Sequence, residues 1–180
     1  MQIGLSITKG RSKIGKRLDK TTKDNIVFTK HTLIMAISAK RVVGWILYKK
    51  DGIDHKRLIE FLDAILENKK NKLVLMDNAS SHRNPSVKKF IKVSSNDYVH
   101  IFPYNHSLNP IERFFNQLKH YIKKDESMSY DEVKKSIKRA IKKISKDNLK
   151  NYFESSLQKS KEEIEKIKSK FHKKPKIYKD

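Results

Sequence analysis

Two apolar stretches rich in β-branched residues stand close together in the first third of the chain. Residues 31–38 (HTLIMAIS) and 41–48 (RVVGWILY) are separated only by Ala39 and Lys40. Runs of this composition with so short a connection predict an antiparallel hairpin whose strands are largely covered. Trp45 then fits sheet packing better than a role as an exposed platform for stacking bases.

The hydrophobic pattern changes to a helical period after Asp54, which is a candidate N-cap. The apolar residues that follow fall on one face and predict a helix that covers the sheet: Leu58, Phe61, Leu62, Ile65 and Leu66. Residues 72–77 (KLVLMD) then form a short apolar run between polar residues, the pattern of a central buried strand. Asp77 ends that run, so it would place a carboxylate at the C-terminal end of the strand.

Helical and strand patterns continue to alternate along the chain. Residues 84–93 predict a helix, with Asn84 as its cap and Pro85 at its first position, and residues 98–102 predict another strand. Beyond residue 124 the chain is rich in lysine and predicts helices over 129–144 and about 147–170. We therefore expect a single α/β body over residues 1–124 and a helical C-terminal extension over 125–180.

The chain of 180 residues carries a formal net charge of +22, which favours nucleic acid as a partner. An alternative is that AT-rich coding DNA produces this lysine excess whatever the function. There is no cysteine, which excludes disulfides and thiolate zinc sites. No stretch has the pattern of a signal peptide or a membrane span, so we expect a cytoplasmic or other intracellular, DNA-containing compartment.

Residues 9–24 combine basic side chains with Gly10 and Gly15 and show no apolar period, which predicts a solvated loop. Contact with DNA phosphates is a hypothesis for this loop. Its candidate DNA-binding residues are Lys9, Arg11, Lys13, Lys16 and Arg17.

Two carboxylates on separate elements form the strongest candidate for chemistry. Asn109 can cap a helix that has Pro110 at its first position, so Glu112 lies in the first turn, with 34 residues between it and Asp77. Each acid has an ordinary alternative: Asp77 could cap the turn after its strand, and Glu112 could complete a capping box. Together at one sheet edge, they would provide half of a magnesium-type site for phosphodiester chemistry.

The segments LVLMDNASSHRN and HIFPYNHSLNPIERFFNQLKHYIKK resemble the catalytic region of DDE-superfamily transposases, the mariner-like and related bacterial insertion-sequence enzymes. The resemblance makes Asp77 and Glu112 the second and third catalytic, metal-binding acids and implies Mg²⁺ or Mn²⁺ as cofactor. Asn78, His82 and Asn109 match the surrounding pattern and would play supporting roles.

What the resemblance implies about fold is a ribonuclease-H-like mixed sheet flanked by helices. It also implies metal-dependent DNA strand cleavage and transfer, with double-stranded DNA and transposon ends as partners. A homodimer would be compatible with it.

The first acid of the family's triad has no counterpart at the matching place. It should end the first strand, before the basic loop, but MQIGLSITK contains no acidic residue, and Asp19 and Asp24 lie after the glycines. We therefore expect the first strand to be partly or wholly missing, as in an N-terminally truncated copy with impaired activity. The alternatives are a non-catalytic DNA-binding remnant or regulator of transposition, and a basic α/β domain whose two acids are only caps.

Overall fold

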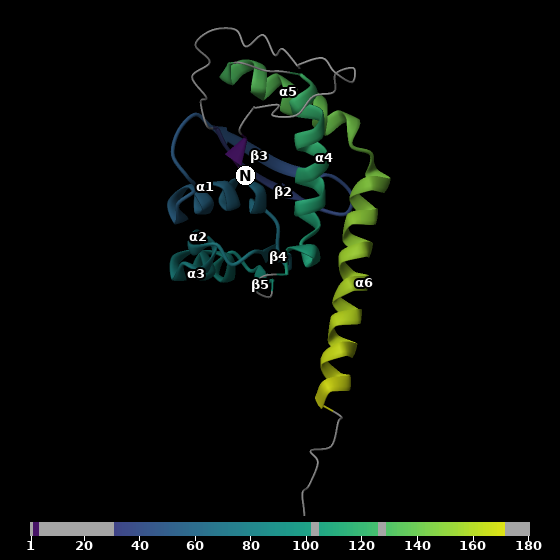
Figure 1. The fold of residues 1–180 in the computed structure, drawn as a ribbon. Helices are drawn as coiled ribbons and strands as arrows, with labels where there is room; N and C mark the ends of the chain where they lie inside the picture. The colour runs from purple at the N-terminus through teal and green to yellow at the C-terminus, as the bar shows by residue number, and fades with distance from the viewer. Residues whose placement is uncertain (1, 4–30, 102–104, 126–128, 172–180) are drawn as a thin grey trace, which may run out of the picture.

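The structure is a computed structural model that describes residues 2–3, 31–101, 105–125 and 129–171. The five DNA-binding residues expected between Lys9 and Arg17 lie outside these ranges. The elements follow one another as three strands, a helix, a strand, two helices, a strand, a short 3₁₀ helix and three further helices (Figure 1).

Strands β2 (His31–Ile37) and β3 (Val42–Tyr48) confirm the predicted hairpin. They pair antiparallel with Met35 opposite Trp45, and the register shifts between Ala36 and Ile37. On the other side of β2 lies β1 (Gln2–Ile3), which is also antiparallel. Within the described ranges this first strand comprises Gln2 and Ile3, and the expectation that it is partly missing stays a prediction.

One face of the hairpin is covered by α1 (His55–Leu66), which begins at Asp54 as expected. The Asp54 side chain accepts a hydrogen bond from the Arg57 amide at 2.8 Å. The helix approaches β3 so closely at Gly44 that an added Cβ would lie 2.8 Å from a methyl group of Ile65. Ile34 of β2 shares its core with buried residues of α1 and of the elements that follow: Leu58, Phe61, Leu62, Leu66, Met76, Val87 and Ile91.

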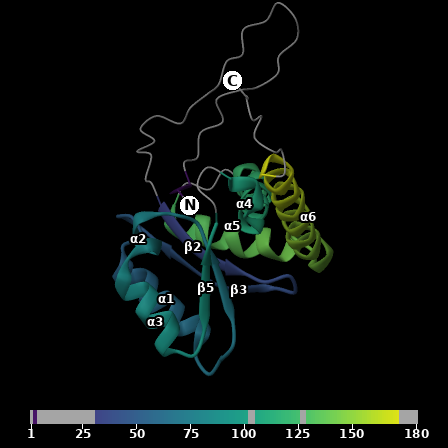
Figure 2. The ribbon, with the colours of Figure 1, turned by 90° about the horizontal axis from the view of Figure 1, so that it is seen from below.

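The other face is covered by α4 (Pro110–Lys124), α5 (Tyr130–Lys143) and α6 (Lys146–Phe171) (Figure 2). Its core joins strand residues to all three helices: Leu33, Met35, Leu47, Phe114, Leu118, Ile122, Val133, Ile137, Ala140, Ile144 and Leu149. Trp45 packs against this cluster, which confirms its predicted role in sheet packing. The lysine-rich helices therefore supply part of the hydrophobic core.

Strands β4 (Leu73–Met76) and β5 (Asp97–His100) form a separate parallel pair, with Met76 opposite His100. Helices α2 (Ser80–Arg83) and α3 (Pro85–Val93) connect them, and Asn84 caps α3 through the Ser86 amide at 2.9 Å.

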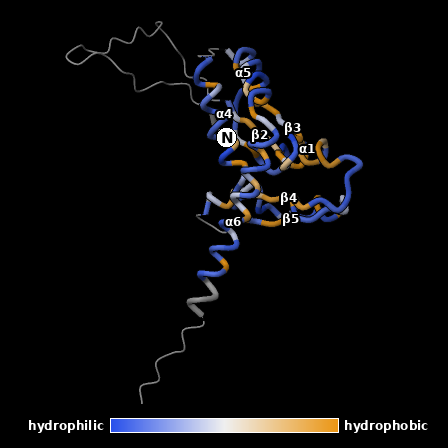
Figure 3. Tube along the Cα trace, turned by 90° about the vertical axis from the view of Figure 1, so that its right-hand side faces the viewer, coloured by the Kyte–Doolittle hydropathy of each residue, from blue (hydrophilic) through white to orange (hydrophobic). Residues whose placement is uncertain are grey.

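The strand expected over residues 72–77 forms at Leu73–Met76, but the expectation that it is buried on both faces is wrong. Leu73 is 65% and Leu75 is 41% exposed, and Val99 on the neighbouring strand is 45% exposed. Among the described residues β4 pairs only with β5, and helices cover only the face that carries Val74 and Met76. Figure 3 shows apolar residues running along both strands. The alternation of buried and exposed positions is that of a strand covered on one side.

No described helix is both long enough and apolar enough to cross a membrane.

Candidate active site

The C-terminal ends of β4 and β5 are tied together just where Asp77 begins the next segment. The amide of Ile101 donates to the carbonyl of Met76 at 2.9 Å, which extends the ladder by one bond. The side-chain amide of Asn78 donates to the Ile101 carbonyl. These bonds hold the Asp77 segment against the end of β5, so hydrogen bonds fix the backbone that carries the Asp77 carboxylate.

The Asp77 carboxylate is positioned by two local donors. Its Oδ1 accepts a hydrogen bond from the Ala79 amide at 3.0 Å and lies 2.6 Å from Nδ1 of His82. A carboxylate can only accept, so the proton of this bond resides on His82 Nδ1. The side chain of Asp77 is 44% exposed, which leaves it accessible to solvent. Asp77 therefore caps the turn after its strand and, at the same time, keeps its carboxylate accessible to solvent.

His82 reaches Asp77 because the chain turns into the four-residue helix α2 directly after Ala79. The His82 side chain is 24% exposed, less than that of its partner. This arrangement resembles the way an imidazole orients a metal-binding carboxylate through a hydrogen bond. The supporting role expected for His82 is compatible with this contact and stays a prediction.

A second histidine, which the sequence did not single out, also contacts this segment. Nδ1 of His100 lies 3.1 Å from the backbone carbonyl of Asp77, to which it must donate. His100 stands opposite Met76 in the parallel register, so the contact joins the last positions of the two strands. A pattern confined to neighbouring residues contains no signal for it, because the two partners are 23 residues apart.

Glu112 lies in the first turn of α4, as the sequence predicted. Asn109 is buried and caps this helix: its side chain accepts from the Ile111 amide at 3.4 Å and its carbonyl from the Glu112 amide at 3.2 Å. No described residue forms a hydrogen bond or ion pair with the Glu112 carboxylate, so the capping box is not made. In α5, by contrast, Ser129 and Glu132 make both capping-box bonds.

The beginning of α4 is supported by α6, which packs against both α4 and the 3₁₀ turn η1 (His106–Leu108). The Tyr152 hydroxyl of α6 donates to the side-chain carbonyl of Gln117, whose amide donates to Tyr121 at 3.2 Å. Burial raises the pKa of the Tyr152 hydroxyl above its usual value of 10.0. The helix that carries Glu112 is therefore held by more than its own capping bonds.

The two acids lie on segments that follow the neighbouring strands β4 and β5. Asp77 follows β4 directly, and Glu112 follows β5 through residues 102–104, which lie outside the described ranges, and η1. In Figure 1 the end of α4 that carries Glu112 lies at the level of β4 and β5, and α5 lies at its other end.

Both acids offer hard oxygen donors, which suit Mg²⁺ or Mn²⁺. Magnesium is often held by only one or two protein carboxylates together with water and substrate phosphates, so these donors fit such an ion. Across the described ranges, no three His, Cys, Asp or Glu side chains gather into a metal-binding group.

Comparison with known proteins agrees with this geometry. The family described as DDE superfamily endonuclease matches residues 2–134. No curated protein matches the chain. Among solved structures, the Mos1 transposase paired-end complex with left transposon end superposes with a TM-score of 0.73 at 18% identity, covering 87% of this chain and 50% of that one.

Two further Mos1 structures extend the comparison. The Mos1 mariner paired-end complex with Mn gives a TM-score of 0.70 at 19% identity, over 88% of this chain and 50% of the other. The Mos1 catalytic domain with raltegravir and Mg gives 0.62 at 19% identity, over 72% and 69%. This chain thus spans about half the length of the Mos1 chains in the paired-end complexes.

The likeness confirms the predicted ribonuclease-H-like α/β fold with a helical C-terminal part. The family match covers most of the chain and includes both Asp77 and Glu112. The chain therefore belongs to the DDE superfamily endonucleases.

Proposed function

We propose that this chain acts on double-stranded DNA at transposon ends as a DDE-type transposase catalytic domain, performing metal-dependent strand cleavage and transfer. One observation carries the proposal: Asp77 directly follows β4 and accepts a hydrogen bond from His82, and Glu112 lies half-buried in the first turn of α4. The Mos1 complexes with a transposon end, with Mn and with Mg support the choice of substrate and ion.

In this proposal Asp77 and Glu112 hold the divalent ion, and the other site residues keep the two acids in place. His82 restricts the rotation of the Asp77 carboxylate, Asn78 ties its segment to Ile101, and Asn109 fixes the first turn of α4. When bound, the ion would activate water or a 3′-hydroxyl and stabilise the leaving oxygen. Mg²⁺ and Mn²⁺ both suit this ligand set.

We further propose that cleavage by residues 1–180 alone is weak. No acidic residue occurs among the first 18 residues, and within the described ranges no third metal-binding side chain joins Asp77 and Glu112. Two-metal displacement relies on ions held about 3.5–4 Å apart, which two carboxylates clamp less firmly than three. The same observation favours the second candidate, a non-catalytic DNA-binding remnant or regulator of transposition.

The test is nicking of a labelled DNA duplex in Mg²⁺ or Mn²⁺ by the wild type and by Asp77→Asn and Glu112→Gln. The matched control is Asp63→Asn, which changes an exposed carboxylate on α1. We expect slow, metal-dependent nicking that both site variants abolish and the control retains. Nicking that is unchanged in both site variants contradicts the proposed site. An absence of nicking in every protein, with DNA binding intact, favours the non-catalytic candidate instead.

A further inference from the structure

The outward face of α5 is built almost entirely from cationic side chains. Its buried face carries Val133, Ser136, Ile137 and Ala140, which pack against the body. Beyond the first turn, where Asp131 and Glu132 are exposed, all the exposed positions of α5 are cations: Lys134, Lys135, Lys138, Arg139, Lys142 and Lys143. We call these six residues the α5 basic face. Lys49, which directly follows β3, adds a cation beside the first turn of α5, since its ammonium lies 5.0 Å from the ring centre of Tyr130.

Little negative charge neutralises the α5 basic face. The acids of α5 are Asp131 and Glu132, both in the first turn, and Glu132 is engaged in the capping box. Asp125 is taken by Arg139, at 2.8 Å from its guanidinium. Lys143 lies over the ring of Tyr121, at 5.6 Å from its centre. The other four lysines of the face form no ion pair within the described ranges: Lys134, Lys135, Lys138 and Lys142.

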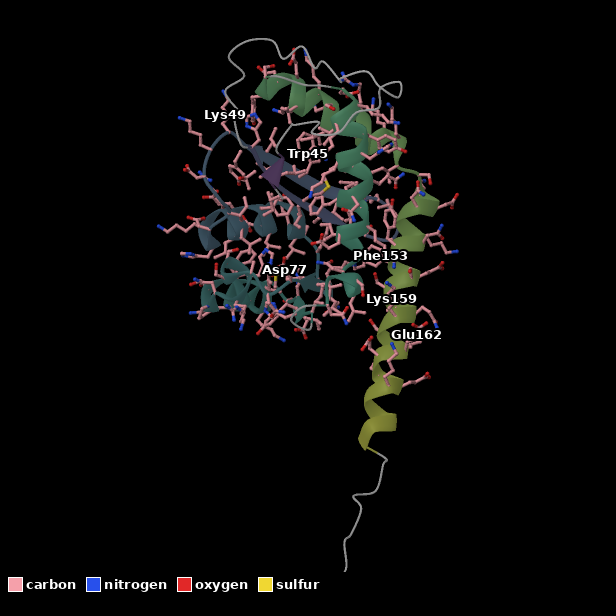
Figure 4. All side chains as sticks on the ribbon, viewed as in Figure 1. Trp45, Lys49, Asp77, Phe153, Lys159 and Glu162 are labelled. Carbon is pink, nitrogen blue, oxygen red and sulfur yellow. The ribbon has the colours of Figure 1, made fainter. Side chains whose placement is uncertain are left out.

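Lysines elsewhere in the C-terminal part behave differently, so the basic face is not only a consequence of overall composition. Along α6 the cations alternate with acids, and they form the pairs Lys150 with Glu154 and Lys166 with Glu163. Figure 4 shows Lys159 and Glu162 on the same stretch of this helix. A uniform excess of lysine would not concentrate unpaired cations on one helix and balance them on the next.

The spacing of these cations suits a polyphosphate. Lys134, Lys138 and Lys142 are four residues apart, so they rise in steps of about 6 Å along one side of the helix. Duplex DNA carries one negative charge for roughly every 1.7 Å of its axis, so a row about 12 Å long faces several phosphates. The row has no aromatic residue among its members, which favours contact with the backbone over stacking on bases.

We infer that the α5 basic face binds the phosphate backbone of duplex DNA without reading its sequence. The choice of DNA as the polyanion rests on the proposed function. The surface is distinct from the two acids, because α4 separates them: Glu112 lies in its first turn, whereas Asp125 at its end bonds to Ser136 and Arg139 of α5. The 15 residues of α4 correspond to a length of about 22 Å.

The experiment compares duplex binding by the wild type, a triple variant of the face and a charge-matched control. The triple variant is Lys134→Gln, Lys138→Gln and Lys142→Gln. The control carries Lys146→Gln, Lys159→Gln and Lys161→Gln on α6, which removes the same net charge. Fluorescence anisotropy with a labelled 20-base-pair duplex gives Kd from about 50 to 200 mM salt, in EDTA so that cleavage plays no part.

We expect the face variant to bind roughly tenfold or more weakly at the lowest salt and to reduce the slope of log Kd against log salt by about 2.7. The control should keep the wild-type slope. Equal losses in the two variants would overturn the inference, because binding would then follow net charge alone. It is also overturned if the face variant keeps its DNA slope but loses binding to anionic lipid vesicles.

Failure of this inference is distinguishable from failure of the proposed function. Asp77→Asn and Glu112→Gln should keep the wild-type Kd for the duplex in EDTA. Circular dichroism melting of each variant checks that the fold is retained. If the face variant melts at a lower temperature than the wild type, it is replaced by Lys134→Arg, Lys138→Arg and Lys142→Arg, which keeps the charge. This variant should show the wild-type slope of log Kd against log salt. A lower slope would mean that charge at these positions does not bind DNA.

Discussion

Nδ1 of His82 lies 2.6 Å from Oδ1 of Asp77, so His82 contacts the carboxylate itself, whereas His100 contacts the backbone carbonyl of the same residue. We predict that His82→Ala raises the Mn²⁺ concentration needed for half-maximal nicking by about 10- to 100-fold, since partners that orient a metal ligand have effects of this size. His82→Asn keeps a short donor and should recover part of the loss. The control is His120→Ala on the exposed side of α4.

A role for His82 in stability alone would give another result. The metal concentration at half-maximal nicking would then stay at its wild-type value, and only the melting temperature would fall. That outcome would remove His82 from the site and leave Asp77 supported by the Ala79 amide.

Asn96 is predicted to stabilise the fold without acting on the chemistry. It is buried at the beginning of β5, where its side chain accepts from the Lys72 amide at 2.9 Å and donates to the carbonyls of Lys69 and Ser94. Asn96→Ala leaves these groups without a partner and should lower the free energy of unfolding by roughly 2–4 kcal/mol.

Urea unfolding measures this loss, with Asn151→Ala on the exposed side of α6 as the control. Below the melting temperature the metal dependence of nicking should equal that of the wild type. A stability change as small as the control's would show that the bonds of Asn96 contribute nothing net.

Asp125 gives the fold a predicted pH dependence. Hydrogen bonds from the buried Ser136 hydroxyl and then from Arg139 hold the pKa of this carboxyl below its usual value of 3.8. A lowered folded-state pKa stabilises the protein above the unfolded pKa, and this contribution is lost as the pH falls through the folded-state pKa. Asp125→Ala should therefore cost about 1–3 kcal/mol at pH 6 and progressively less below about pH 4.

Denaturant unfolding at pH 6, 4 and 3 tests this dependence. Asp63→Ala, which removes an exposed carboxylate of α1, is the control and should show little change at each pH. A difference between wild type and Asp125→Ala that is as large at pH 3 as at pH 6 would rule out the charge as its origin.

The exposed face of β4 predicts tolerance to a polar side chain. Leu75 is 41% exposed, whereas Ile91 on α3 is fully buried. Leu75→Thr should change the free energy of unfolding by less than about 1 kcal/mol, as surface substitutions usually do. Ile91→Thr should cost roughly 2–4 kcal/mol, because it loses packing and buries a hydroxyl. Thermal melting that shows similar losses for both would mean that the Leu75 face is covered in solution.

Local patterns were sufficient for most of the elements, and they also selected Asp77 and Glu112, whose role as metal-binding acids stays a prediction. The hairpin at 31–48 and the cap at Asp54 were predictable because turn length and side-chain period are properties of neighbouring residues. The burial of β4 was not predictable, because burial depends on which elements lie beside the strand. The apolar composition of β4 suits one covered face as well as two. Contacts across long separations, such as His100 with Asp77, left no local signal.

The boundary predicted after residue 124 stays a prediction. Val133 and Ile137 of α5 and Leu149 of α6 share one buried cluster with Phe114 of α4. The high lysine content of these helices suggested an extension outside the body. The lysines occupy exposed positions, however, and apolar residues occupy the buried positions between them at helical spacing. Composition therefore says little about which helices belong to the core.

The central claim is that Asp77 and Glu112 hold the same divalent ion, and a double-variant cycle on Mn²⁺ binding tests it most directly. Free Mn²⁺ would be measured by electron paramagnetic resonance for wild type, Asp77→Asn, Glu112→Gln and the double variant, with duplex DNA present and Asp63→Asn as the control. We predict that each single variant weakens binding and that the double variant weakens it by less than the sum of the two free-energy losses. Losses that add fully, or Mn²⁺ binding unchanged in either single variant, would contradict a shared site.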